Sequence, residues 1–242
     1  MRHFVISITA IILTSLGLFG CSALDRPSKN IVQKVNPSAR EGVEGLTSPD
    51  PVRRAFYAVS LEMMFDYKPE PAVPFLIDLL DDDVLVMLPD DGERSPRDYA
   101  IGTLASIGQP AFPPLVNALR DSRWKIRSGA VEALGKMNDP RTVTPLISSM
   151  KDTRWEVRYK AVEALAWKKG PRALETLIAA ARDKNRYVTL KAIEGLKNRE
   201  DFLNPAPLIA ELNNPDWAVR VEAVRALADL YQKTMFHLLR RV

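Results

Sequence analysis

Apolar residues recur along most of the chain with the period of amphipathic helices. Between residues 123 and 137 they fall at the i, i+3 or i+4, and i+7 spacing that places them on one face of a helix. A second such face follows Asp139 and Pro140, which are typical of a helix start. The apolar residues of the two faces are Ile126, Ala130, Ala133, Leu134 and Met137, then Val143, Leu146, Ile147 and Met150. The pattern predicts a pair of helices joined by a short turn.

This helix pair repeats every 31 residues. Four columns of residues keep the spacing over four units, which chance does not produce. The columns are Asp121, Asp152 and Asp183 with Asn214; Arg127, Arg158 and Arg220 with Thr189 in third place; Ala130, Ala161, Ala192 and Ala223; and Leu134, Leu165, Leu196 and Leu227. No segment after residue 95 alternates like a strand. Because a helix pair cannot bury its apolar face alone, the repeats are expected to stack into an all-α solenoid.

The first helix of each unit carries the motif Val-Arg-x-x-Ala-x-x-Ala-Leu, with small variations. A 31-residue helix pair with this motif resembles the short HEAT repeat, the type first named for phycobilisome lyases. A fainter copy begins at Arg97, one residue out of phase, and the segments at Pro51 and Pro74 suggest a degenerate first unit. The resemblance covers residues 49–242 and implies a right-handed α-solenoid of about five to six stacked helix pairs. It says little about activity, since this repeat occurs in proteins of many functions.

The Arg column has two interpretations. In the first, its side chains form a structural ladder, pairing with the Asp column or with backbone carbonyls between neighbouring units. In the second, they form a basic binding stripe. We favour the ladder, whose residues are Arg127, Arg158, Arg220, Asp121, Asp152 and Asp183.

The HEAT resemblance also implies that the first helices line a concave surface with the positions their apolar faces leave free. These positions hold Trp124, Lys125, Glu132, Trp155, Tyr159, Lys160, Glu163, Arg186, Tyr187, Lys191, Glu194, Trp217 and Arg225, with Ser128, Gly129, Glu156, Leu190, Ala218, Val221 and Glu222 among their neighbours. Asp98 and Tyr99 would extend the row. Aromatic residues and Arg dominate affinity at protein interfaces, and mixed charge suits a protein or peptide partner better than a polyanion. Alternatively, the Trp side chains pack against the helix start of the adjacent unit.

The N-terminus has the pattern of an export signal. Met1, Arg2 and His3 give a short basic start, and the segment from Phe4 to Phe19 is free of charge. The following Gly20-Cys21-Ser22 resembles the lipobox of bacterial lipoproteins. The resemblance implies a signal peptide over 1–20, a lipidated Cys21 carrying palmitate-type chains, and a flexible tether over 21–48. Ser22 implies sorting to the outer membrane, facing the periplasm, in a Gram-negative cell. An uncleaved anchor helix is the alternative, because 16 or 17 apolar residues lie at the lower limit for spanning a bilayer.

An acidic insertion over about residues 81–95 interrupts the repeat. Three Asp residues precede the apolar run 84–88, and further acids follow it. The run forms either a short strand or a segment folded back on the stack. A Ca²⁺ site is the less favoured function, because the spacing does not fit an EF-hand loop. We expect the flanking charges to keep the apolar run from aggregating.

Composition removes most catalytic chemistry. The chain has one Cys and two His, and cleavage of the signal would leave His237 as the single His. Gly-rich phosphate loops are absent from the sequence. The remaining candidates, Glu132, Glu163 and Glu194, stand one per unit, about 10 Å apart, too far for paired acid and base work. We therefore predict no catalytic residues, no metal site, no cofactor and no small-molecule substrate. The net charge of +4 is too small to indicate nucleic acid.

Together these patterns predict a membrane-anchored HEAT-repeat lipoprotein that acts as a non-catalytic scaffold or adaptor for another protein in the bacterial cell envelope. The first alternative is a module that binds envelope polysaccharide or peptidoglycan through the aromatic row. The second is an enzyme that uses the groove carboxylates.

Overall fold

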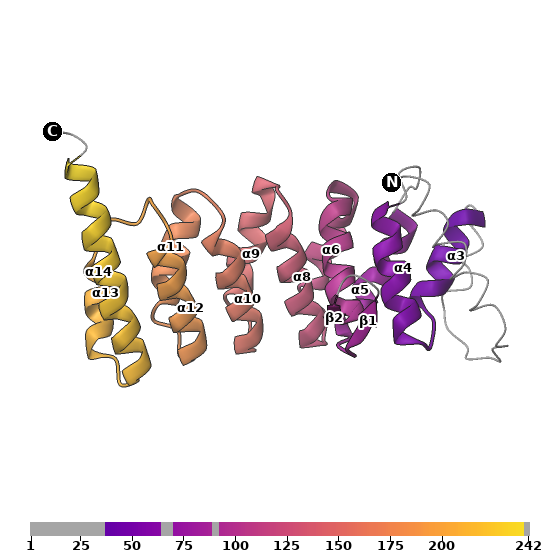
Figure 1. The fold of residues 1–242 in the computed structure, drawn as a ribbon, viewed down its shortest axis with the longest axis horizontal. Helices are drawn as coiled ribbons and strands as arrows, with labels where there is room; N and C mark the ends of the chain where they lie inside the picture. The colour runs from indigo at the N-terminus through magenta and orange to yellow at the C-terminus, as the bar shows by residue number, and fades with distance from the viewer. Residues whose placement is uncertain (1–36, 64–69, 89–91, 240–242) are drawn as a thin grey trace. The chain divides into compact units, whose positions relative to one another are not determined.

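The computed structural model describes residues 37–63, 70–88 and 92–239, with the side chains of residues 42–61, 70–88 and 92–235. They belong to one compact unit, Val35–Val242. The expected signal peptide, Cys21 and the first part of the expected tether lie outside the described residues. Apart from one small hairpin the described unit is helical, and its helices follow one another in a single row (Figure 1). The predicted all-α solenoid is confirmed.

Five helix pairs form the row, and α14 (Trp217–Leu239) follows them as a further first helix. The pairs are α4 (Pro51–Met63) with α5 (Val73–Asp78), α6 (Pro96–Ile107) with α7 (Phe112–Ala118), α8 (Trp124–Lys136) with α9 (Val143–Ser149), α10 (Trp155–Ala166) with α11 (Pro171–Ala180), and α12 (Arg186–Lys197) with α13 (Ala206–Ala210). Short 3-10 turns adjoin the second helices: η1 (Glu70–Ala72), η2 (Leu79–Asp81), η3 (Gln109–Ala111), η4 (Pro140–Thr142) and η5 (Glu211–Asn213). The Asp139 carboxylate accepts from the backbone N–H of Arg141 and so caps the start of η4.

Small and branched apolar residues of the first helices form the core between repeats. Every member of the Ala column, and the Leu column from α8 to α12, is fully buried. The helices approach closely at glycine: a Cβ added to Gly135 would lie 2.6 Å from the Cβ of Ala164 on the next first helix. Each buried Leu contributes about 1.5–3 kcal/mol relative to an exposed one. Packing of one first helix on the next therefore holds the row together.

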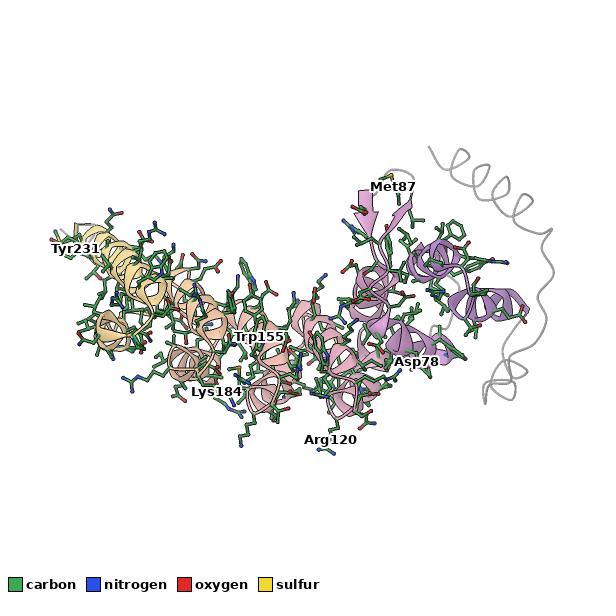
Figure 2. All side chains as sticks on the ribbon, turned by 90° about the horizontal axis from the view of Figure 1, so that it is seen from below. Asp78, Met87, Arg120, Trp155, Lys184 and Tyr231 are labelled. Carbon is green, nitrogen blue, oxygen red and sulfur yellow. The ribbon has the colours of Figure 1, made fainter. Side chains whose placement is uncertain are left out.

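The row is curved, with the two helices of each pair on opposite sides. Trp155, on first helix α10, lies on the inner side of the curve (Figure 2). Asp78, Arg120 and Lys184, at the ends of second helices or in the turns after them, lie on the outer side (Figure 2). The first helices therefore supply the concave surface.

Arginines in the first helices join neighbouring repeats. Arg127 donates from Nε and Nη2 to the carboxylate of Asp152 at 2.7 and 3.0 Å, and from Nη1 to the carbonyl oxygen of Asp121 at 2.8 Å. Arg158 repeats this arrangement with Asp183, at 2.8 Å for both bonds. Burial raises the pKa of the Asp152 and Asp183 carboxyls, but hydrogen bonds from the arginines and from backbone N–H groups, together with nearby positive charges, outweigh it and hold each pKa below its usual range. Bidentate pairs are geometrically specific, so they fix the register of adjacent repeats.

Two residues of the expected ladder have other partners. Arg220 donates from Nη1 to the carbonyl oxygens of Asn214 and Pro215, and no described carboxylate pairs with it. Asp121 forms its ion pair with Arg123, two residues further along its own turn, at 3.1 Å. The ladder with full bidentate pairing therefore runs from α8 through α10 to the turn before α12.

The first repeat contains a further member of the ladder that the sequence motif did not identify. Arg54 donates from Nε to Asp82 at 2.6 Å and from Nη1 to the carbonyl oxygens of Ser48 and Pro49. The sequence motif pointed to Arg53, one position earlier. The one-residue shift explains why the first repeat looks degenerate in the sequence.

A second set of basic side chains covers the carboxyl ends of the first helices. Lys168 donates from Nζ to the carbonyl oxygen of Met137 at 2.6 Å, and Arg199 donates from Nη1 to that of Lys168 at 2.5 Å. Lys233 contacts the carbonyl oxygen of Lys197 in the same way. Burial lowers the pKa of Lys168. Cations at this end of a helix satisfy free carbonyls and interact favourably with the helix dipole.

The expected tether differs from the structure in its last part. Residues Pro37–Leu46 form helix α3, which packs on α4. Val43 and Leu46 are buried, and Gly45 lies against the ring of Tyr57. Two apolar residues with glycines beside them make a weak periodic signal, so the sequence suggested a polar linker. The folded part thus begins before residue 49.

The acidic insertion contains a two-stranded hairpin. Strand β1 (Val86–Leu88) pairs antiparallel with β2 (Gly92–Arg94), with Val86 opposite Arg94. Val86 and Leu88 are buried, whereas Met87 is 73% exposed. The hairpin projects on the inner side of the curve (Figure 2). Of the two expected forms of the run, the structure shows the strand.

Candidate functional site

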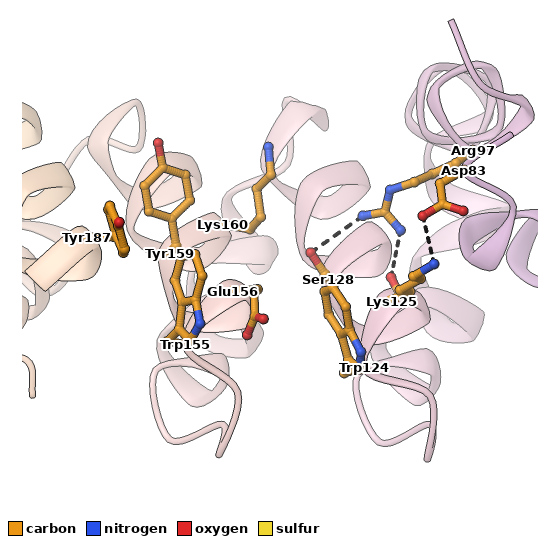
Figure 3. A pocket seen from close by; sticks show the side chains of 10 residues that line it. All are labelled: Asp83, Arg97, Trp124, Lys125, Ser128, Trp155, Glu156, Tyr159, Lys160 and Tyr187. Atoms are coloured by element: carbon orange, nitrogen blue, oxygen red, sulfur yellow. Dashed lines mark hydrogen bonds and ion pairs between the residues drawn. The ribbon is translucent and has the colours of Figure 1, made fainter. Parts of the chain in front are cut away.

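A groove of about 470 Å³ lies on the concave surface, over α8, α10 and the start of α12 (Figure 3). It extends across three repeats, from the insertion to the second position of α12. Its lining residues are Asp83, Arg97, Trp124, Lys125, Ser128, Trp155, Glu156, Tyr159, Lys160 and Tyr187. Helices α8 and α10 both begin at a Trp, which places one indole in each repeat at the same height of the groove.

Aromatic rings form the centre of the groove. Trp155 meets Tyr159 edge to face at 6.4 Å between centroids and Tyr187 of the next repeat at 5.2 Å, with 32° between the latter ring planes. Trp155 nevertheless remains 36% exposed and Tyr187 51% exposed. Trp124 is half-buried beneath the guanidinium of Arg154, 4.9 Å from its ring centroid. Trp155 therefore both packs on the adjacent repeat and presents a ring to solvent.

The insertion and α6 close one end of the groove. Arg97 donates from Nη1 to the carbonyl oxygens of Leu80 and Lys125, the latter at 2.7 Å, and its Nη2 lies 3.4 Å from the Ser128 hydroxyl. Lys125 donates to Asp83 at 2.7 Å, and this bond lowers the pKa of Asp83. These contacts hold the basic side chains at this end in fixed positions (Figure 3).

Carboxylates hold the lysines along the groove. Lys160 lies 3.2 Å from Glu132 and 2.9 Å from Glu163. Burial lowers the pKa of Lys160, but the two carboxylates outweigh this effect and raise it overall. Lys191 repeats the arrangement with Glu194 at 2.8 Å. The Glu column therefore serves as counter-ions to lysines.

Glu156 is the exception among the acids of the groove. Its Oε1 accepts from Arg154 at 2.7 Å, whereas its Oε2 is buried and has no hydrogen-bond partner among the described residues. It lies between the indoles of Trp124 and Trp155 (Figure 3). Glu156 therefore keeps an unsatisfied acceptor beneath the surface of the groove.

A second hollow of about 430 Å³ continues the concave surface toward α14, and its lining residues are Tyr159, Tyr187, Leu190, Lys191, Glu194, Lys197 and Glu222. The structure thus brings together eight of the expected concave residues: Trp124, Lys125, Trp155, Tyr159, Lys160, Tyr187, Lys191 and Glu194. The remaining five line neither hollow: Glu132, Glu163, Arg186, Trp217 and Arg225.

Those five residues lie beside the hollows. Glu132 and Glu163 act through Lys160, and Arg186 pairs with Asp216 at 3.2 Å. Trp217, 66% exposed, stands at the start of α14. The side chain of Arg225 is 69% exposed. The row of expected residues is therefore longer than the hollowed surface.

Three lining residues, Asp83, Arg97 and Lys197, were not expected. Arg97 begins the faint copy of the motif, which is one residue out of phase with the other units. The inserted hairpin breaks the repeat register before α6, and Arg97 contacts the concave edge of α8 instead of the Asp column. Only the register break gave a signal in the sequence.

The described residues contain no group of three or more His, Cys, Asp and Glu side chains that could hold a metal ion. Among the helices described, none is long and apolar enough to cross a membrane.

Comparisons with known proteins find similarity over the repeats. Residues 84–165 and 143–201 match the family of HEAT repeats. A chain of the CpcE–CpcF complex of phycocyanin lyase from Nostoc sp. PCC7120 superimposes with a TM-score of 0.51 at 25% identity, covering 64% of this chain and 98% of that chain. A search of curated proteins finds no match to the sequence.

Two larger proteins share the fold alone. Kap95p, in a structure with RanGDP, gives a TM-score of 0.55 at 14% identity, covering 85% of this chain. Kap121p gives 0.59 at 16% identity, covering 88% of this chain. The chain spans 32% of Kap95p and 27% of Kap121p. The sequence match and the fold together support a HEAT-repeat protein, with matched repeats extending over residues 84–201.

Proposed function

We propose that this chain is a membrane-anchored adaptor of the bacterial cell envelope, whose concave groove binds another protein without catalysis of its own. The observation that carries the proposal is the aromatic cluster of the groove. Trp155 and Tyr187 expose large rings at the centre of a hollow surface, although the two rings also pack on each other across neighbouring repeats. Exposed aromatic rings in a concave, partly desolvated site are the usual anchors of protein recognition.

The charges of the groove support a protein or peptide as the ligand. Lys125 and Lys160 are already paired with acids of the chain. A polyanion would require cations without such counter-ions, whereas a polypeptide offers both signs of charge and backbone amides. Kap95p, a neighbour in fold, binds the protein RanGDP. Protein binding is thus compatible with both the fold and the charges.

Substitution of the central indole tests the groove. We expect Trp155→Ala to weaken partner capture from envelope extracts about tenfold or more, since an interface hot spot contributes at least about 2 kcal/mol. The control is Trp167→Ala, because Trp167 is 81% exposed and lies outside both hollows. Circular dichroism should be unchanged for both variants. Equal capture by the Trp155 and Trp167 variants would remove the groove from the proposal.

The membrane anchor is supported by the sequence before residue 37. Basic, apolar and small residues precede Cys21 in the order of a lipoprotein signal. A single acyl chain binds membranes only marginally, and two or more give a stable anchor. Cys21→Ala should abolish palmitate labelling and move the protein out of the membrane fraction or leave the precursor uncleaved. Ser28→Ala, in the same polar segment, should change neither. Unaltered labelling of the Cys21 variant is the contrary result.

A polysaccharide ligand is the second candidate, favoured by one observation. The rings of Trp155 and Tyr187 are tilted by only 32° and lie beside charged side chains, an arrangement on which a sugar ring can stack. Peptidoglycan fragments should then quench the tryptophan fluorescence, and Trp155→Ala should abolish the effect.

Catalysis is the weakest of the three interpretations. Lys160 lies between Glu132 and Glu163, at 3.2 and 2.9 Å, so these two carboxylates are closer together than the spacing of about 10 Å expected from the sequence. Both are engaged with the same ammonium group, and Glu194 is engaged with Lys191. Because one neighbour in fold is a phycocyanin lyase, the absence of catalysis belongs to the proposal. Full partner capture by a Glu163→Gln variant would agree with it.

A further inference from the structure

Helices α8 and α10 turn the same set of side chains toward the next repeat. The set has an Arg, then a branched apolar residue four positions later, then a small residue after four more. Its members are Arg127, Val131 and Gly135 in α8, and Arg158, Val162 and Ala166 in α10. Because positions i, i+4 and i+8 share one helix face, the three side chains form a stripe. We call this stripe the docking face of a first helix.

In α8 and α10 the next repeat covers the centre of the docking face completely. Val131 and Val162 have no exposed surface. Arg127 is held by Asp152, which lies three residues before the start of α10. Gly135 lies so near α10 that an added Cβ would be 2.6 Å from that of Ala164. The partner of a docking face is therefore a helix with an Asp just before its first turn and small apolar residues along one side.

Helix α14 has the same face in the same register. Its members are Arg220, Val224 and Ala228, each of which lies two repeats of 31 residues after its counterpart in α10. The stripe continues along α14 with Tyr231 and Met235. Val224 is 57% exposed, Tyr231 66% and Met235 40%. Figures 1 and 2 place α14 at the end of the row opposite α3, and Tyr231 lies at the extreme end of the row (Figure 2). Among the described residues no helix covers this face.

Arg220 is preset as its counterparts are. Its Nη1 donates to the carbonyl oxygens of Asn214 and Pro215, as the Nη1 of Arg127 donates to those of Asp121 and Ser122. In Arg127 this leaves Nε and Nη2 directed at a carboxylate. In Arg220 the same two atoms have no acceptor among the described residues. The guanidinium is thus held in the geometry that binds an Asp.

We propose that the docking face of α14 is a binding site for a helical segment of another protein. That segment carries an Asp three residues before its helix and presents small and branched apolar side chains to Val224 and Tyr231. Its Asp receives the bidentate pair from Arg220. The site lies on a different surface from the concave groove, so it stands independently of the function proposed above.

A second copy of this chain fits the site poorly. The opposite end of the row is covered by α3, and Ser48 stands there where later repeats carry the Asp. Two α14 helices packed in parallel would bring two Arg220 side chains together without an acid between them. Charge and register therefore favour a partner that supplies the carboxylate.

The chain itself provides a probe for this site. A synthetic peptide of residues 152–170 contains Asp152 and the helix that covers Arg127 and Val131 in the intact protein. Held helical by a staple on its opposite side and labelled with a fluorophore, it should bind the purified full chain in detergent. Val224→Asp should weaken binding at least tenfold. Arg220→Ala, and Asp152→Ala in the peptide, should each weaken it, and the two changes combined should weaken it no further, since both remove one ion pair.

Matched controls use exposed residues elsewhere on the unit. Val84→Asp replaces a valine that is 51% exposed, and Arg182→Ala replaces an arginine whose side chain is 67% exposed. Both variants should bind the peptide like the original chain. Circular dichroism distinguishes loss of the site from loss of fold.

Three results would overturn the proposal. The peptide fails to bind, or it binds the Val224→Asp variant as well as the original chain. Alternatively, Trp155→Ala weakens binding instead, which would place the peptide in the groove. A sedimentation experiment covers the remaining occupant: dimers of the full chain that Val224→Asp dissociates would make a second copy the partner.

Discussion

At the scale of single residues, planar side chains with fixed hydrogen-bond geometry set the spacing between repeats. The pairs Arg127–Asp152 and Arg158–Asp183 could be predicted from the sequence, because both members recur every 31 residues. Lys168 was not predicted, because backbone carbonyls are its acceptors and they leave no trace in a sequence.

A buried ladder arginine should matter more for stability than an exposed arginine on another first helix. Arg158 is only 4% exposed and satisfies Asp183 and two carbonyl oxygens. Arg158→Ala should lower the free energy of unfolding by about 2–4 kcal/mol, since it leaves a carboxylate without its partner. Arg225→Ala should change it by less than about 0.5 kcal/mol, because that side chain is 69% exposed. Urea denaturation measures both, and equal midpoints for the two variants would contradict the ladder.

At the scale of elements, periodic segments were predictable and close approaches were not. The helices from α8 to α12 follow apolar periods that the sequence states clearly. Helix α3 depends on Gly45, which lets it lie against Tyr57, and a glycine in a sequence usually suggests a linker. The sequence did not decide the structure of the insertion, because a five-residue apolar run fits a strand or a buried segment equally well.

A single methyl group at Gly45 tests whether α3 belongs to the folded unit. A Cβ there would lie 2.0 Å from the Tyr57 ring, so Gly45→Ala must move α3 away from α4. We expect a loss of about 1–3 kcal/mol and faster hydrogen exchange in residues 37–46.

Gly102→Ala is the matched control for that substitution, because nothing lies within 4 Å of the added Cβ in helix α6. It should leave exchange in α3 unchanged and stabilise the protein by up to about 1 kcal/mol. Unaltered exchange in the Gly45 variant would mean that α3 does not pack on α4.

At the scale of the whole molecule, the curved row of helices brings recurring surface residues of three repeats together along one groove. The resemblance to HEAT repeats implied which recurring residues would share the concave surface, and the structure brings eight of them to its hollows. The sequence did not predict where the surface is hollowed. That depends on Arg97, whose register changes because of the inserted hairpin, and on the stacking of Tyr187 against Trp155.

The most direct test of the adaptor role is site-specific photo-crosslinking in intact cells. A photoreactive phenylalanine replaces Trp155 or Tyr187 in the groove, or Trp167 outside it. We predict that positions 155 and 187 crosslink the same envelope protein and that position 167 does not. Crosslinks to that protein from position 167 alone, or none from either groove position, would contradict recognition by the concave groove.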